Sequence, residues 1–449
     1  MRGTGTYRGD SLVSFDVQQA VREVLPTVTQ ALDAATVTGD EAVREYARAV
    51  ITDLVREHVD SRALAGRDAP TLQEEHRLAE AVYNEIFALG RLQPFVDDPE
   101  VENIDVNGCD QVWITYRDGR KALGPPIADS DEELVGNVRR WAAYQGQTTR
   151  DFSIARPRLH LSVGHRTRIA ALMGVTPRPC LSIRRHGLLE ADLDDLMVNG
   201  TVDKGLRAFL AAAVRAHKDI VITGGMGDGK TTFARALAAE IAPDERIATV
   251  EKEYELFLHL QTDRHRDVLA MEAREGNTEG LGAITMRQLI EDALRFNARR
   301  IIVGEVRGDE LVPMLEAMNT GGSGSICTMH ADSADQVFAR MLILAGSGGL
   351  SIAPDTLFRT IGMAVDFVVH LRHELRHDID GLVNRRYVAE VNEVLPPGDG
   401  LEPAVNHVYV PGSDGRAVPN TIPQCMEELV AAGFDPDLFA PRAWDRGYA

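Results

Sequence analysis

The stretch Gly224–Thr232 reads GGMGDGKTT and contains the pattern G-x-x-x-x-G-K-[S/T]. The apolar run DIVIT (219–223) precedes it, and the helix-like run TTFARALAAEIA (231–242) follows it. A strand, a glycine-rich turn and a helix in this order are the setting in which the pattern binds nucleotide phosphates. Glycines let backbone amides approach a phosphate closely, and the helix N-terminus adds the positive end of its dipole. The segment therefore predicts a phosphate-binding loop in an α/β domain.

The residues of this loop have distinct expected roles. Lys230 is expected to reach the β- and γ-phosphates of a nucleoside triphosphate, and the Thr231 hydroxyl to hold Mg²⁺. Asp228 adds a carboxylate where phosphate is to bind, so we expect its side chain to point toward water. The residues expected to bind nucleotide are Gly224, Gly225, Met226, Gly227, Asp228, Gly229, Lys230, Thr231 and Thr232.

Three further candidate catalytic side chains follow runs that are typical of strands. Glu305 lies in RIIVGEVRGDE (300–310), Glu251 follows IATV, and His330 follows GGSGSICTM. The carboxyl ends of parallel strands meet at one edge of a sheet, so we expect these side chains near the loop. Glu305 would polarise the attacking water or hold Mg²⁺, and Glu251 would coordinate the metal, orient water, or simply belong to a charged loop. His330 would sense the γ-phosphate or a neighbouring subunit.

Alternation of strand-like and helix-like patterns predicts a parallel sheet with crossover helices over residues 200–395. Residues 1–75 predict small amphipathic helices, and residues 76–195 a small α/β domain. Residues 396–449 hold eight of the twenty prolines and predict an irregular tail packed on the surface. The strand-like runs of the larger domain are Ile220–Thr223, Ile247–Val250, Ile301–Val303 and Ser325–Met329.

Composition limits the classes of function. The chain has 449 residues and a formal charge of −20, so contact with nucleic acid or anionic lipid needs a local basic patch. The four cysteines show no spacing typical of a zinc site and suggest a reducing compartment. The first residues lack the apolar run of a signal peptide, and no window is long and apolar enough for a transmembrane helix. We therefore expect a cytoplasmic protein.

One region reverses the acidic balance. Between Arg139 and Arg185 there are ten arginines, no lysine and a single acid, Asp151. Such a run forms either a solvated basic face or an anion site, because guanidinium groups bind phosphate oxygens in pairs. The anion would be a nucleotide phosphate or a nucleic-acid backbone. The aromatic residues in this run keep the second alternative open; they are Trp141, Tyr144 and Phe152.

Taken in order, these segments resemble the type II/type IV secretion ATPase superfamily, and most closely its CpaF-type branch of tight-adherence (Tad) pilus motors. The resemblance runs from about residue 70 to about residue 395. The segments that carry it in the larger domain are GGMGDGKTT, TVEKEYEL from Thr249, RIIVGEVRGDE, and GSICTMHADSADQVFARM from Gly324. The segments upstream are FVDDPEVENIDVNG (95–108), VGHRTR (163–168) and LSIRR (181–185).

The resemblance implies a PAS-like N-terminal domain, preceded by a helical extension and hinged to a RecA-like motor domain, in a homohexameric ring. It implies ATP in the phosphate loop, with Glu305 as the Walker B acid and His330 as the histidine box. The acidic box falls on Glu251, Glu253 and Glu255, but Lys252 stands where the family usually has an acid, which leaves open which acid holds the metal. The N-terminal-domain arginines that reach the nucleotide fall on Arg166, Arg184 and Arg185.

The function implied is a hexameric Mg²⁺-dependent ATP hydrolase. It would drive assembly or retraction of a Tad-like type IV pilus, or type II-like secretion, through inner-membrane platform proteins. The chain would be peripheral at the inner face of the cytoplasmic membrane through these partners, with no direct contact with nucleic acid. Two alternatives stay open at this point: a nucleic-acid translocating motor of the conjugation or competence type, and a regulatory ring that does not hydrolyse ATP.

Overall fold

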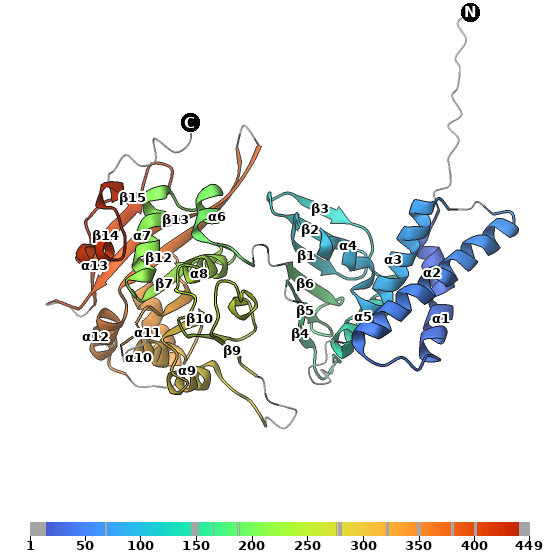
Figure 1. Ribbon diagram of the computed structural model, residues 1–449, viewed down its shortest axis with the longest axis horizontal. Helices are drawn as coiled ribbons and strands as arrows, with labels where there is room; N and C mark the ends of the chain where they lie inside the picture. The colour runs from blue at the N-terminus through green and yellow to red at the C-terminus, as the bar shows by residue number, and fades with distance from the viewer. Residues whose placement is uncertain are drawn as a thin grey trace, which may run out of the picture. The chain divides into compact units, whose positions relative to one another are not determined.

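The computed structural model divides the chain into two compact units, Met1–Arg185 and His186–Ala449, which are described separately. Figure 1 shows the elements of both units along the chain. The structure describes residues 15–67, 70–144, 152–164, 166–185, 187, 189–274, 276, 281–319, 323–347, 352–378, 381–398 and 402–439.

The first unit begins with three helices around a small apolar core. They are α1 (Val17–Asp33), α2 (Asp40–Leu64) and α3 (Leu72–Phe87). Val28, Ile51 and Leu78, one from each helix, are buried together. A capping box of Thr71 and Glu74 fixes the start of α3, as the T-L-Q-E sequence predicts.

A six-stranded antiparallel sheet completes the first unit, with strand order β3-β2-β1-β6-β5-β4. Helix α5 packs on this sheet, and both contribute side chains to one core that includes Leu134, Val138 and Ile183. The elements are η1 (Gly90–Leu92), α4 (Gln93–Asp97), β1 (Val101–Asn107), β2 (Val112–Tyr116), β3 (Lys121–Gly124), α5 (Asp131–Tyr144), β4 (Arg158–Val163), β5 (Thr167–Leu172) and β6 (Cys180–Arg185).

The second unit is built on a nine-stranded sheet with the order β15-β14-β13-β12-β7-β11-β10-β8-β9. The six strands from β12 to β9 in this order are parallel to their neighbours, and β13, β14 and β15 are added antiparallel. The strands are β7 (Ile220–Gly224), β8 (Ile247–Glu251), β9 (Val268–Glu272), β10 (Arg300–Val306), β11 (Ile326–His330), β12 (Phe367–Asp378), β13 (Gly381–Leu395), β14 (Ala404–Pro411) and β15 (Ala417–Pro419).

Helices cover both faces of this sheet (Figure 1). Alternate residues of β7 enter two separate cores: Ile220 and Ile222 pack with α6, α7 and α8, while Val221 packs with α9 to α12. The helical elements are α6 (Leu193–Val198), α7 (Lys204–Arg215), α8 (Lys230–Ala238), η2 (Leu258–Leu260), α9 (Met286–Arg295), α10 (Leu311–Asn319), α11 (Val337–Ser347), α12 (Pro354–Ala364), α13 (Met426–Ala431) and η3 (Pro436–Phe439).

The predicted fold class is confirmed. The larger unit is a parallel-sheet P-loop domain of the RecA-like class, and a smaller α/β unit with N-terminal helices precedes it. Within the described part of the chain, every helix is too short or too polar to span a bilayer.

The prediction of an irregular C-terminal tail from residue 396 is wrong. Strand β14 pairs with β13, and β15 pairs with β14, so the chain after residue 396 extends the sheet. Two of the prolines that suggested irregular structure lie where strands tolerate them, since Pro419 ends the edge strand β15 and Pro411 ends the adjacent strand β14. The residues from 440 to 449 lie outside the described residues.

The C-terminal segment also contributes to the core, which gives a stability prediction. Phe434 is buried and packs edge-on against Phe209 of α7, with ring centroids 5.7 Å apart. Replacing Phe434 with Ala leaves a cavity, so we expect urea unfolding to show a loss of about 3–5 kcal/mol in the free energy of unfolding. Val430, 43% exposed on the neighbouring helix, is the control: Val430→Ala should cost less than about 1 kcal/mol. Equal effects of the two substitutions would contradict the packing.

Candidate functional site

The phosphate loop connects the end of β7 to the start of α8. Gly224, Gly227 and Gly229 have φ angles of 153°, 82° and 92°, which favour glycine. At Gly224 a side chain is also excluded by space, because a Cβ atom would lie 2.8 Å from the carbonyl oxygen of Leu371 on β12. All three positions therefore favour glycine for backbone conformation, and Gly224 also needs it for the close approach of β12.

The Lys230 side chain folds back over the loop and is only 7% exposed. Its ammonium group donates to the carbonyl oxygens of Gly224 at 3.0 Å and of Gly225 at 2.6 Å. A buried ammonium needs such oxygens, because burial without partners is strongly unfavourable. The charge therefore stands at the centre of the loop, where it can attract phosphate.

His330 lies beside Lys230, and Glu305 lies beside His330, at the strand ends near the loop. His330 Nε2 lies 3.0 Å from Glu305 Oε1, and His330 Nδ1 lies 3.2 Å from Lys230 Nζ. His330 Nδ1 also lies 3.2 Å from the carbonyl oxygen of Gly224, so this nitrogen faces both a donor, the Lys230 ammonium, and an acceptor. The outer oxygen of Glu305 accepts from the Arg307 guanidinium at 2.5 Å. A continuous polar chain thus joins the loop to the ends of β11 and β10.

Burial lowers the pKa of His330, and the adjacent Lys230 charge lowers it further, while Glu305 acts in the opposite direction. The imidazole is therefore neutral near pH 7 and becomes protonated at a lower pH than an ordinary histidine does. A protonated ring would place a second cation beside Lys230.

Glu251 and Glu255 have different positions in the acidic segment after β8. Glu251 is buried, and its Oε1 accepts from the backbone amides of Glu255 and Leu256, both at 2.9 Å. Glu255 Oε2 accepts from the Thr231 hydroxyl at 3.0 Å. The structure therefore places Glu255, rather than Glu251, against the threonine expected to hold metal, and Glu251 shapes the turn that presents it. The expected coordinating role of Glu251 stays a prediction.

The expectation that Asp228 points to water is wrong. Its Oδ2 accepts from the amide of Gly225 at 2.5 Å, and the side chain is half-buried. The carboxylate closes the loop on itself, because a short acidic side chain can satisfy a backbone amide three residues earlier. Met226, by contrast, is 85% exposed at the outer turn of the loop, and Thr232 is half-buried on α8.

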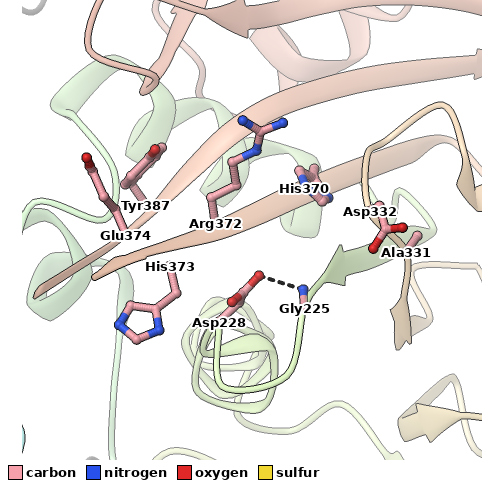
Figure 2. A pocket seen from close by; sticks show the side chains of 9 residues that line it. All are labelled: Gly225, Asp228, Ala331, Asp332, His370, Arg372, His373, Glu374 and Tyr387. Carbon is pink, nitrogen blue, oxygen red and sulfur yellow. Dashed lines mark hydrogen bonds between the residues drawn. The ribbon is translucent and has the colours of Figure 1, made fainter. Parts of the chain in front are cut away.

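A pocket opens between this loop and the β12–β13 hairpin (Figure 2). Figure 2 shows Asp228 and Gly225 on one side, with the hairpin side chains opposite. His370 is buried there, with its Nδ1 2.9 Å from the Thr223 hydroxyl, and burial lowers its pKa to about 4. The pocket is lined by Gly225, Asp228, Ala331, Asp332, His370, Arg372, His373, Glu374 and Tyr387.

The three arginines implied to reach nucleotide lie on the first unit. Arg166 and Arg184 are exposed, and Arg185 is half-buried. Burial, together with the charges of Arg117 and Arg166, lowers the pKa of Arg185. Arg117 belongs to none of the sequence motifs and follows β2, far from Arg185 in the chain. Its Nε donates to the carbonyl of Pro99, as does Arg185 Nη1.

The wider arginine run is less available to a polyanion than its sequence suggests. Trp141 and Phe152 are buried in the core and present no faces for stacking bases. Arg140 pairs with Glu85, and Arg178 pairs with Asp131 and Asp110. Arg150 and the side chain of Tyr144 lie outside the described residues.

The match to a known protein family covers the part of the chain that contains this loop. The family described as "Type II/IV secretion system protein" matches residues 156–388, just over half of the chain. This chain belongs to that family. The recognition of the secretion ATPase superfamily is thereby confirmed, while the narrower placement in the CpaF-type branch stays a prediction.

The alignments with individual relatives cover most of each relative's length. A protein described as "Putative conjugal transfer protein" from Mycobacterium tuberculosis is 33% identical over 330 residues, 72% of this chain and 88% of that one. The type IV secretion system protein VirB11 of Brucella suis is 29% identical over 337 residues, 68% of this chain and 89% of that one.

Solved structures are also similar to this chain. The crystal structure of Brucella suis VirB11 in complex with sulphate has 23% sequence identity and a TM-score of 0.35, and the match covers 68% of this chain and 95% of that one. The pilus retraction motor PilT with bound ADP follows at 14% identity and a TM-score of 0.47, covering 69% and 83%.

The polar chain through His330 gives a prediction about proton binding. A ¹H–¹³C NMR titration of the ring should give His330 a pKa below the ordinary 6.5, with His330→Gln identifying the signal. Lys230→Ala should raise that pKa, because it removes a nearby positive charge, and Glu305→Gln should lower it further. A pKa at or above the ordinary value, or no response to Lys230→Ala, would contradict the arrangement.

Proposed function

We propose that this chain is a Mg²⁺-dependent ATPase that powers assembly or retraction of a Tad-like type IV pilus, or type II-like secretion, through a membrane platform. The observation that carries the proposal is the buried Lys230 ammonium, held at 3.0 and 2.6 Å by two loop carbonyls and joined through His330 to Glu305. Such a charge at a glycine loop and a helix N-terminus is suited to the phosphates of ATP.

Each residue of the site has a separate role in phosphoryl transfer. Lys230 and the loop amides stabilise negative charge on the transferring phosphoryl group. Glu305 orients the attacking water, and His330 lies between this carboxylate and Lys230. Arg307 neutralises the outer oxygen of Glu305 until nucleotide binds. Catalysis on this plan rests on position and charge and needs no covalent intermediate.

The residues around Thr231 fit Mg²⁺. The Thr231 hydroxyl and a Glu255 oxygen lie 3.0 Å apart, and both are hard oxygen donors of the kind that Mg²⁺ prefers. Among the described residues no group of three His, Cys, Asp or Glu side chains is arranged to hold a metal ion. Mg²⁺ would therefore take its remaining ligands from water and from phosphate oxygens of ATP. It would neutralise the charge of those phosphates.

We propose a homohexameric ring as the working form. The resemblance gives Arg166, Arg184 and Arg185 the task of completing the nucleotide site from the N-terminal domain. Nucleotide binding and release would then move one domain against the other, which is an ordinary domain closure. Inner-membrane platform proteins would take up this motion and hold the motor at the inner face of the cytoplasmic membrane.

Phosphate release by the purified chain with ATP and Mg²⁺ tests the proposed chemistry. Lys230→Ala should lower the rate at least about 100-fold by removing the central positive charge. Glu305→Gln should keep ATP bound and lower turnover by about 100-fold or more. Lys204→Ala, at an exposed lysine on α7, is the control and should leave the rate unchanged. Full turnover with Lys230→Ala would refute the site, and an inactive wild type that binds ATP would favour the regulatory ring.

A second candidate, a nucleic-acid translocating motor, is favoured by the conjugal-transfer description of the Mycobacterium tuberculosis relative. The two motors differ in what stimulates them. DNA should leave the ATPase rate of a secretion motor unchanged, whereas anionic lipid vesicles or a platform fragment should raise it. Stimulation by DNA that falls steeply with salt would instead support translocation, because phosphate contacts release counterions.

A further inference from the structure

Arg386 reaches the phosphate loop from another part of the fold. It lies on β13, opposite His373 of β12. Its Nε donates to the carbonyl oxygen of Gly227 at 2.7 Å. Its aliphatic stem also lies along the loop, because a Cβ atom on Gly229 would be 3.4 Å from Arg386 Cδ. One side chain from a distant strand therefore contacts the loop at two of its glycines.

The bond to Gly227 determines the direction of a neighbouring amide. In a trans peptide the carbonyl and the amide hydrogen point in opposite directions. Holding the Gly227 carbonyl toward Arg386 therefore points the Asp228 N–H in the opposite direction within that peptide plane, away from Arg386. Gly227 lies at a φ of 82°, next to the exposed Met226, in a part of the loop with little side-chain packing of its own. A glycine there has wide conformational freedom unless something outside the loop restrains it.

Arg386 is itself held by a rigid strand. The adjacent Arg385 forms an ion pair with Glu374 of β12 at 2.5 Å, and its Nη2 donates to the carbonyl of Asp414 at 3.1 Å. These contacts fix β13 on both sides without involving the loop. The guanidinium of Arg386 therefore comes from a strand that is paired with β12 and held by further contacts outside the loop.

We propose that Arg386 is a positioning residue that preorganises the phosphate loop, orienting the Asp228 amide for a phosphate oxygen before ATP arrives. The proposal rests on the proposed function for the identity of the ligand, but the ordering of the empty loop is a property of the chain alone. A loop that is already ordered loses less conformational entropy when phosphate binds, so affinity for ATP rises.

The same contact couples the β12–β13 hairpin to the loop. A partner that displaced the hairpin would weaken nucleotide binding, and bound nucleotide would weaken the binding of that partner equally.

The test compares Arg386→Gln, Arg386→Lys and the control Arg385→Gln in the full chain. Hydrogen–deuterium exchange without nucleotide should be faster across residues 225–229 in Arg386→Gln than in the wild type. Arg385→Gln should leave exchange across that loop unchanged, because its bonds go to Glu374 and Asp414 and the backbone pairing of β12 with β13 still holds the strand. Arg386→Lys keeps a donor and should restore part of the protection.

Titration with a fluorescent ATP analogue provides the second readout. Arg386→Gln should weaken binding about tenfold, the size expected for one lost hydrogen bond to a charged donor, with the lysine variant in between. Unchanged exchange in Arg386→Gln, or equal loss in Arg385→Gln, would overturn the positioning role. Absence of analogue binding by the wild type would refute the proposed function instead, and the exchange result would still decide the role of Arg386.

Discussion

The site depends on one interaction: the ammonium of Lys230 on the carbonyl oxygens of Gly224 and Gly225. It fixes a positive charge at the point where β7 ends and α8 begins. The strand order then determines what surrounds that charge, because β11 and β12 flank β7 and β10 follows β11. The ends of β11 and β10 therefore bring His330 close to Lys230 and Glu305 close to His330.

The parts of this site that the sequence predicts are those governed by local rules. The loop pattern specifies glycines with unusual backbone angles, and an apolar run followed by a polar residue places Glu305 and His330 at a sheet edge. The contacts that were not predicted join distant positions or depend on side-chain direction. Glu255 was one of three acids in a charged run, and only the turn held by Glu251 directs it to Thr231. Arg386 had no motif at all, because a strand pairing made far from the loop puts it there.

The same reasoning explains the error at the C-terminus. A high proline content predicts irregular structure, yet proline is tolerated at strand ends and at sheet edges. Strands β14 and β15 extend the motor sheet, and Tyr409 and Phe434 complete the core against Phe209. The arginine run was a comparable case: its aromatic residues are core residues, and several of its arginines have acidic partners. Charge counts in a sequence do not show which charges are already paired.

The most direct test of a nucleotide site organised around Lys230 is a crystal structure with a non-hydrolysable ATP analogue and Mg²⁺. The account predicts the triphosphate within the loop at 224–232, with Lys230 Nζ exchanging its contact with His330 Nδ1 for a phosphate oxygen, and Thr231 on the metal. An analogue bound elsewhere on the chain, or an empty loop at saturating analogue with Lys230 still bonded only to its carbonyls and to His330, would contradict it.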